Sequence, residues 1–145
     1  DDGTTLYDSR VICEYLDAHS KAARVLPDSG AARWRALTQQ ALGDGIMDAG
    51  ILQVYEKRLR PEEIHHAPWL ELQQGKIERA LAALESEPPA AGSSPSLGEI
   101  AIACALGYLD FRFDGAWRSS HPGLVAWLDA FEAAVPAFDA TRPPA

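Results

Sequence analysis

The sequence predicts an all-α protein, a bundle of helices preceded by one short strand. Three observations support this fold class. From residue 9 onward, apolar residues recur at spacings of three and four, the period of a helix packed on one face. Prolines and capping residues divide that stretch into segments of helical length. Only residues 4–7, with the sequence TTLY, are rich in strand-forming side chains.

The first expected element is a strand at residues 4–7, which follows a DDG turn at residues 1–3. No later segment alternates as a partner strand would, so this strand alone would leave its backbone edge unpaired. We therefore expect the rest of its sheet to lie upstream. A helix should follow over residues 9–19, capped by Asp8 or Ser9, with an apolar face made by Val11, Ile12, Tyr15 and Leu16.

The longest helix is expected over residues 31–60, because Pro61 ends the helical pattern. An apolar stripe along it comprises Trp34, Leu37, Ala41, Leu52, Tyr55 and Leu59. The next helix should begin with Pro68 in its first turn and run to about residue 87. Its apolar face comprises Leu70, Gln73, Ile77, Ala80, Leu81 and Leu84.

A polar linker rich in proline and glycine, PPAAGSSPS, separates these helices from the last two. Ser96 opens the first of the two and Glu99 stands three residues later, the spacing of a capping box whose loss should cost about 1 kcal/mol. The residues expected to face inward are Leu97, Ile100, Ala101, Cys104 and Tyr108. The last helix should start near Pro122 and end at Pro136, with Leu124, Trp127, Leu128, Phe131 and Val135 on its apolar face.

The charge and composition exclude several classes of partner. The net charge is -8, so the chain lacks the concentration of Lys and Arg that nucleic-acid binding needs. The longest apolar run, residues 100–109, would extend only about 15 Å as a helix, against about 30 Å of membrane hydrocarbon. No secretory signal opens the sequence. Cys13 and Cys104 lie far apart within apolar patterns, which predicts buried, reduced thiols in a cytoplasmic protein.

The opening segment, DGTTLYDSRVICEYLD, resembles the last strand and third helix of the thioredoxin-like half of glutathione transferases. The stretches PSLGEIAIACALGYLDFR, HPGLVAWLDAF and TRPP are similar to the C-terminal domain of the same family, and DGIMDAG to a bacterial subgroup. The resemblance implies a remnant of the thioredoxin-like domain at residues 1–22 and an all-helical C-terminal domain at residues 31–145. The family has Asp where Glu99 stands, a change that keeps a hydrogen-bond acceptor.

The resemblance also implies a binding site at Asp8 and Ser9. Glutathione carries an ammonium and a carboxylate at its γ-glutamyl end. Asp8 can hold the ammonium, while the Ser9 hydroxyl and the free amides of the first helical turn can receive the carboxylate. The alternative is that both residues only cap a helix. The residue that activates the glutathione thiol would lie upstream, so the chain itself contains no catalytic residue and is expected to be a fragment without activity.

Two further pairs of residues are candidates for the site. In this family an electrophile binds between the domains, and Tyr55 and Tyr108 are candidates to line its pocket because each combines an apolar ring with a hydroxyl; both could equally be core aromatics. Asp44 and Asp48 lie one helical turn apart, where like charges destabilise a helix. They could be solvated carboxylates, or one could reach the ammonium of glutathione bound to a partner subunit, as in several classes of the family.

No metal site is expected. Two carboxylates make a poor site for a divalent cation, and His65 and His66 lack the spacing of a helical zinc motif.

The resemblance as a whole implies a cytoplasmic homodimeric enzyme in which the glutathione thiolate attacks a small hydrophobic electrophile, with glutathione as co-substrate and no other cofactor. The alternative is a non-catalytic module of the same fold that binds other proteins.

Overall fold

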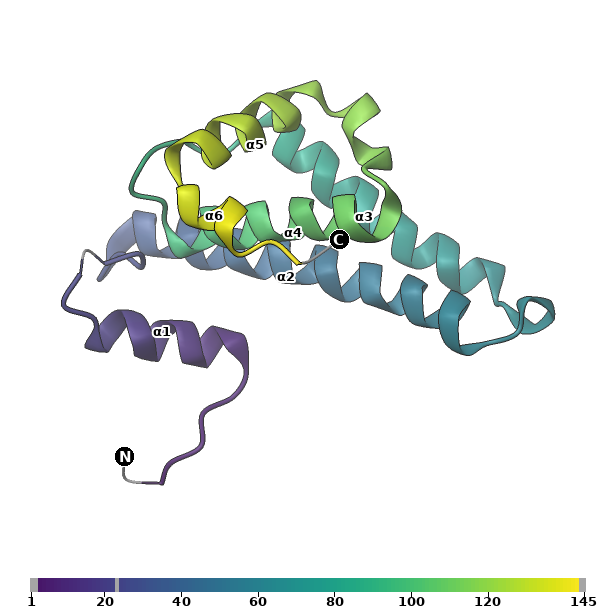
Figure 1. The fold of residues 1–145 in the computed structure, drawn as a ribbon, viewed down its shortest axis with the longest axis horizontal. Helices are drawn as coiled ribbons and strands as arrows, with labels where there is room; N and C mark the ends of the chain where they lie inside the picture. The colour runs from purple at the N-terminus through teal and green to yellow at the C-terminus, as the bar shows by residue number, and fades with distance from the viewer. Residues whose placement is uncertain (1–2, 23, 144–145) are drawn as a thin grey trace.

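The computed structural model describes residues 3–22 and 24–143. In these ranges the regular secondary structure begins at Ser9 and consists of helices joined by loops (Figure 1). Helix α1 lies beside the first half of the long helix α2, apart from the other helices. Helices α2 and α3 form a hairpin, and α5 and α6 lie over α4. The elements are α1 (Ser9–His19), α2 (Gly30–Leu59), η1 (Glu62–Ile64), α3 (Ala67–Ser86), α4 (Leu97–Phe113), η2 (Ala116–Ser120), α5 (Pro122–Ala134) and α6 (Pro136–Ala140).

The five predicted helices are confirmed, and their ends lie within a residue or two of the predicted ones. The prolines explain this agreement, since Pro61 follows the end of α2 and Pro68 and Pro122 occupy the first turns of α3 and α5. Three short elements were not predicted: the 3-10 helices η1 and η2, and the α-helix α6. Pro136 does not only end α5 but also begins α6, because proline is favourable in a first helical turn.

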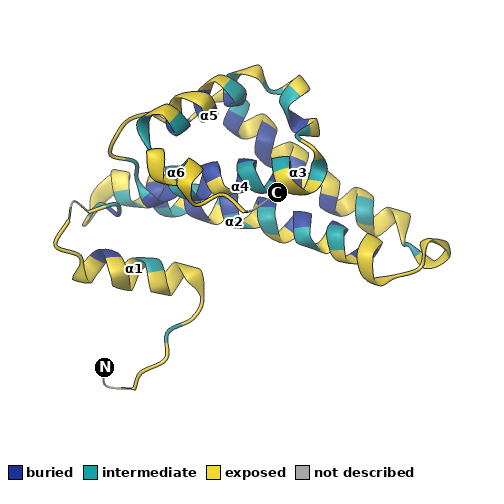
Figure 2. Cartoon of the chain, in the orientation of Figure 1, coloured by how far each residue is buried: buried dark blue, intermediate teal, exposed yellow. Residues whose placement is uncertain are grey.

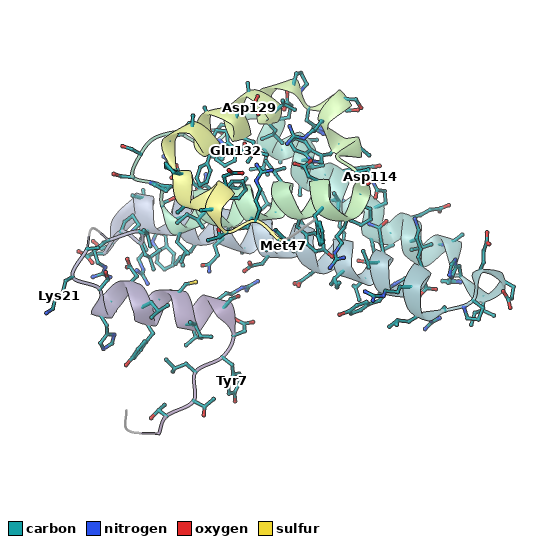
Figure 3. All side chains as sticks on the ribbon, viewed as in Figure 1. Tyr7, Lys21, Met47, Asp114, Asp129 and Glu132 are labelled. Carbon is teal, nitrogen blue, oxygen red and sulfur yellow. The ribbon has the colours of Figure 1, made fainter. Side chains whose placement is uncertain are left out.

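The predicted strand is wrong. Residues 4–7 adopt no regular secondary structure, and the described part of the chain contains no strand. A strand is defined by ladder hydrogen bonds to a second strand, so strand-forming side chains alone cannot produce one. Tyr7 instead projects into solvent, with 80% of its surface exposed (Figure 3). The turn expected at residues 1–3 begins outside the described residues.

Helices α2 and α4 cross in close contact because each has a glycine at the crossing. A Cβ at Gly43 would lie 2.7 Å from the carbonyl oxygen of Ala101, and one at Gly98 would lie 2.5 Å from that of Ala36. Real Cβ atoms do not approach backbone atoms so closely, so the two helices need these glycines to pack. A glycine in the middle of a helix is unfavourable unless another element packs closely against it, and at Gly43 that element is α4 of the same chain.

The side of α2 that packs in the bundle is not the apolar stripe that predicts the helix. Trp34, Tyr55 and Leu59 are 68%, 50% and 70% exposed (Figure 2). The packed side consists of small and polar residues together with one large apolar residue: Ala36, Gln40, Gly43, Ile46, Ala49, Gly50, Gln53 and Glu56. Leu37 of the stripe does pack against the small cluster of Leu26, Ala36 and Leu97. The exposed row along α2, made of Trp34, Leu52, Tyr55 and Leu59, remains uncovered in this chain, a feature typical of surfaces that bind another protein.

The main core lies between α2, α3, α4 and α5. The predicted apolar face of α5 is confirmed, because Leu124, Leu128 and Phe131 are at most 1% exposed. Phe131 meets Phe138 of α6 edge-on with 5.6 Å between ring centroids, which anchors the short last helix.

No helix in the ranges the structure describes is long and apolar enough to cross a membrane.

The predicted inward face of α4 is partly wrong. Leu97 and Ala101 are buried, Ile100 and Tyr108 are partly buried, and Cys104 is exposed. Cys104 and Cys13 are free thiols, as predicted, but neither is fully buried. The reason is that α4 is buried around most of its circumference, with Leu97 and Ala101 against α2, and Cys104 lies on the strip that remains open. Enough protein still surrounds Cys104 that burial raises the pKa of its thiol, and Cys13 raises it further.

The predicted capping box at the start of α4 is confirmed. The backbone amide of Glu99 donates to the Ser96 hydroxyl at 3.4 Å, and the backbone amide of Ser96 donates to the Glu99 carboxylate at 2.6 Å. The amide of Leu97 also donates to the carbonyl of Val25 at 2.8 Å, which ties the segment after α1 to the start of α4. Ser96 and Glu99 thus have a structural role.

Candidate functional site

The start of α1 presents a carboxylate and a hydroxyl to solvent. Asp8 is the N-cap residue, and its side chain accepts a hydrogen bond from the backbone amide of Arg10 at 3.2 Å. Ser9 is the first helical residue, and both Asp8 and Ser9 are exposed. The structure therefore confirms that Asp8 caps the helix and leaves both side chains accessible at the positive end of the helix dipole.

Arg10 connects this helix start to α2. Its Nε atom lies 2.6 Å from Oδ2 of Asp44, with which it forms an ion pair and a hydrogen bond. That hydrogen bond and the charge of Asp44 raise the pKa of Arg10, and Asp8 and Asp48 add to the effect. The structure thus brings Asp44 and Asp48 close to the start of α1, although 34 residues separate Arg10 from Asp44.

Asp44 and Asp48 have different surroundings. The Asp44 side chain is 18% exposed and is already paired with Arg10. Asp48 lies one turn further along α2 and is exposed. Sequence reasoning treated the two residues as equivalent and did not single out Arg10, because no local pattern indicates which distant carboxylate an arginine will meet.

A second charged contact ties the middle of α1 to α2. Arg33 lies 3.4 Å from the carboxylate of Glu14. A cavity of about 390 Å³ between the two helices is lined by Arg10, Val11, Glu14, Leu37, Gln40 and Ala41. The contact between α1 and α2 thus combines ion pairs with apolar side chains and is incompletely filled.

The end of α1 is held by a buried carboxylate. Asp17 is 5% exposed and accepts hydrogen bonds from the Arg24 side chain and the Val25 amide, each at 2.7 Å. Burial alone would raise the pKa of Asp17, but these hydrogen bonds, with one from the Leu26 backbone, outweigh burial and lower it. This carboxylate fixes the last turn of α1 to the loop that leads into α2.

Tyr108 of α4 packs against Gly50 of α2. A Cβ at Gly50 would lie 2.9 Å from the ring of Tyr108, so glycine makes room for the tyrosine there. The Tyr108 hydroxyl is buried and has no well-formed hydrogen bond to another described residue. Burial raises the pKa of this hydroxyl, and the nearby Arg112 guanidinium opposes the rise only in part.

Tyr55 of α2 adds to the rise in the pKa of Tyr108, which lies on the neighbouring helix α4. Tyr55 is half exposed, however, and lines a cavity of about 520 Å³ at the end of the α2–α3 hairpin. The other residues of that cavity are Leu52, Glu56, Leu59, Arg60, His66 and Trp69. Tyr108 packs against the main core with its hydroxyl buried and does not line this cavity, so of the two tyrosines Tyr55 alone lies in it.

The two adjacent histidines make local contacts near the hairpin turn. The Nε2 atom of His65 is 3.0 Å from the carbonyl oxygen of Arg60, and the backbone amide of His66 donates to the Glu56 carboxylate at 3.0 Å. Within residues 3–22 and 24–143, no three His, Cys, Asp or Glu side chains are grouped so that they could hold a metal ion. Because it accepts the hydrogen bond from the His66 amide, the Glu56 carboxylate caps the turn before α3.

Helix α1 exposes its apolar side chains. Val11, Tyr15 and Leu16 are 48%, 46% and 61% exposed, and Asp17 is the buried residue of the helix (Figure 2). An amphipathic helix normally buries its apolar face against another element. These side chains, like the row along α2, therefore form an apolar surface that the described chain does not cover.

Solved structures of other proteins share the fold of this chain. A glutathione transferase family member from Pseudomonas fluorescens Pf-5, solved with bound S-(propanoic acid)-glutathione, matches with a TM-score of 0.91 and 50% sequence identity over 100% of this chain and 75% of its own. A glutathione S-transferase from Methylobacillus flagellatus KT, solved with glutathione bound, matches with a TM-score of 0.89 and 35% identity over 99% of this chain and 72% of its own.

Sequence comparisons agree with the structural ones. A family profile described as "Glutathione S-transferase, C-terminal domain" matches residues 67–130. The "Uncharacterized GST-like protein YibF" of Escherichia coli (strain K12) is 35% identical over 133 residues, which cover 89% of this chain and 65% of the E. coli protein. Since its helices also superpose along their whole length on a relative of 50% identity, the chain belongs to the glutathione transferase family.

Proposed function

We propose that this chain is the larger, C-terminal part of a glutathione transferase in which Asp8 and Ser9 hold the γ-glutamyl end of glutathione. The observation that carries the proposal is the accessible carboxylate and hydroxyl at the start of α1. The relatives solved with glutathione support it, because they match this chain over almost its whole length. Asp8 would bind the ammonium group, and Ser9 with the first-turn amides would bind the carboxylate.

The remainder of the proposed site would come from a thioredoxin-like domain upstream, of which residues 1–22 would be the end and after which residues 31–145 would form the helical domain; both ranges extend beyond the described residues. Two findings support this division. The chain covers only 65% of the E. coli relative and 75% of the P. fluorescens structure. The exposed apolar side chains of α1 also offer a surface that such a domain would bury.

The proposed reaction is attack of the glutathione thiolate on a small hydrophobic electrophile. The thiol has an ordinary pKa of about 8.5, so an upstream hydroxyl or thiol group would have to stabilise the thiolate at neutral pH. Tyr55 and Tyr108 would line the electrophile pocket. The P. fluorescens relative supports a reaction of this kind, since its bound ligand carries a propanoic acid group on the glutathione sulfur.

We further propose a homodimer that forms through the exposed row along α2. Trp34, Leu52 and Leu59 lie on that side of the helix and are exposed. Gly45 lies there too, and no atom is within 4 Å of the position a Cβ would take. A glycine in a helix costs up to about 1 kcal/mol against alanine, and close approach of a partner helix would explain it. Asp48 would then be the carboxylate free to reach across the interface.

Free cysteines and the glutathione substrate favour a cytoplasmic location.

The function is tested by assays of two proteins, the full-length protein and the isolated 145-residue chain. We expect the full-length protein to bind glutathione and to conjugate it to a chromogenic aryl halide. We expect no measurable conjugation by the isolated chain, because Asp8 and Ser9 contact only one end of glutathione. Turnover by the isolated chain would refute the proposed division of the site. A full-length protein that neither binds nor conjugates glutathione would favour the alternative, a non-catalytic module that binds other proteins.

The dimer is tested by sedimentation of the full-length protein at micromolar concentration. We expect twice the mass of one chain for the wild type, and a shift toward one chain for Gly45→Leu, whose side chain would hold the two helices apart. Lys57→Leu, at an exposed position on another side of the same helix, serves as the control and should remain dimeric. A monomeric wild type, or a Gly45→Leu variant that stays dimeric, would contradict this interface.

A further inference from the structure

We propose that Arg112 binds a carboxylate on the electrophile that glutathione attacks. The inference rests on the proposed function and narrows it, because it assigns the substrate to a class, apolar molecules that carry a negative charge close to the reacting carbon. Arg112 lies in the last turn of α4, and no sequence pattern singles it out. Recognition of the charge adds no step to the proposed reaction.

Helix α1 runs antiparallel to α2. Its first turn pairs with Asp44, whereas its middle pairs with Arg33, which lies nearer the start of α2. The start of α1 therefore points along α2 toward the α2–α3 hairpin turn, as Figure 1 shows. Glutathione held at Asp8 and Ser9 can extend its thiol in that direction by roughly 7 to 10 Å, or two to three residue lengths.

Helix α4 runs parallel to α2 and places Tyr108 in the same direction. Gly98, at the start of α4, lies against Ala36, near the start of α2, and Tyr108 packs further along on Gly50. Gly50 lies beyond Asp44 in α2 by about 9 Å along the helix axis. The thiol of glutathione held at the start of α1 can therefore reach the level of Tyr108.

Arg112 lies one helical turn beyond Tyr108 on the same side of α4. The same side carries Cys104, one turn before Tyr108. Burial raises the pKa of Cys104, and Cys13 of α1 is close enough to raise it further. This strip of α4 thus faces α1 at its Cys104 end and carries Arg112 at the end to which the thiol points.

The guanidinium of Arg112 is held in place without a counter-ion. It lies over the Phe111 ring, 4.4 Å from the ring centroid, and near the Tyr108 hydroxyl, where it opposes the rise in pKa that burial causes. Unlike Arg118 and Arg142, it forms no ion pair with a carboxylate of the residues that the structure describes. Arginine presents its N–H donors in a planar fork that matches a carboxylate. The guanidinium is therefore prepared for an anion from outside the described chain.

The alternative role for Arg112 is purely structural. A basic residue in the last turn of a helix stabilises the negative end of the helix dipole. That role needs only a positive charge, and it predicts a loss of stability in a neutral variant but no discrimination between charged and uncharged ligands.

The test compares two ligands that differ in charge and hardly in shape, S-carboxymethylglutathione and S-carbamoylmethylglutathione, by calorimetric titration of the full-length protein. The wild type should bind the carboxylate about 10-fold more tightly, near the lower end of the range for a hydrogen bond to a charged group. Arg112→Met should abolish this preference by weakening the carboxylate ligand alone, and Arg112→Lys should keep part of it. Tyr108→Phe, which removes the hydroxyl beside the guanidinium, should reduce the preference about 3-fold. The matched control is Arg79→Met, at an exposed arginine of α3, which should leave the preference unchanged.

Titration with glutathione itself separates the inference from the proposed function. A wild type that binds glutathione without preferring the carboxylate ligand would overturn the inference and leave the proposed function standing. A preference that persists in Arg112→Met, or an equal loss of both ligands in that variant, would also overturn it. Thermal unfolding detects the alternative, since lower stability of Arg112→Met with an unchanged preference would leave Arg112 a helix-end residue. If the wild type does not bind glutathione, the proposed function fails and the inference fails with it.

Discussion

Gly43→Ala should destabilise the protein by about 3 kcal/mol, toward the upper end of the usual cost of overpacking a core. The added methyl group would lie 2.7 Å from the carbonyl oxygen and 2.8 Å from the carbonyl carbon of Ala101. These are backbone atoms of α4, so no side chain can rotate away and the two helices must separate. Chemical denaturation of the wild type and the variant measures the effect as a change in the free energy of unfolding.

Gly75→Ala is the matched control for this prediction. Gly75 is also a glycine within a helix, but the atom nearest to its added methyl group is Nη1 of Arg79, at 3.1 Å, the end of a flexible side chain. Alanine should therefore be neutral or stabilise the protein by up to about 1 kcal/mol through its higher helix propensity. Equal stabilities of the Gly43→Ala and Gly75→Ala variants would refute the close α2–α4 crossing.

Asp8→Ala should weaken glutathione binding by the full-length protein by about 1 to 3 kcal/mol, or roughly 5- to 150-fold, through loss of a charge-assisted contact with the ammonium group. Alanine also removes the N-cap, which should cost about 1 kcal/mol of helix stability. Isothermal titration calorimetry measures the first effect and thermal unfolding the second. Both effects come from one exposed side chain, so a second variant is needed to separate them.

Asp8→Asn separates binding from capping. Asparagine caps helices as well as aspartate does, but it has no charge for the ammonium group. We expect Asp8→Asn to keep the stability of the wild type and to lose most of the affinity that Asp8→Ala loses. A wild-type dissociation constant for Asp8→Asn would remove the Asp8 charge from the glutathione site and leave this residue a helix cap alone.

The helices could be predicted from the sequence because their ends are encoded locally. Pro61, Pro68 and Pro122 set helix ends, and Ser96 with Glu99 forms the predicted capping box. The predicted strand failed for the opposite reason, since a strand depends on a partner elsewhere in a chain. The family resemblance, which the comparisons confirm, rested on motifs spread along most of the sequence.

The packed face of α2 could not be predicted from apolar periodicity. The crossing with α4 is decided by Gly43 and Gly98, which are 55 positions apart in the sequence numbering and contribute no hydrophobic signal. The large apolar residues on the other side of α2 gave the stronger signal but remain exposed. The same reasoning explains Cys104, whose place in an apolar run says nothing about which side of α4 meets its neighbours.

The candidate site was predictable in its local part only. A cap by Asp8 or Ser9 follows from adjacent residues, and the structure confirms it at Asp8. The pairing of Arg10 with Asp44 joins two helices and follows only from the fold. That pairing also distinguishes Asp44 from Asp48, which the sequence presents as equivalent members of one helical turn.

A crystal structure of the full-length protein grown with glutathione tests the central claim most directly. We predict that the γ-glutamyl ammonium group lies within hydrogen-bonding distance of the Asp8 carboxylate, and that the adjacent carboxylate meets Ser9 and the first amides of α1. Glutathione bound elsewhere, with the start of α1 unoccupied, would contradict the account.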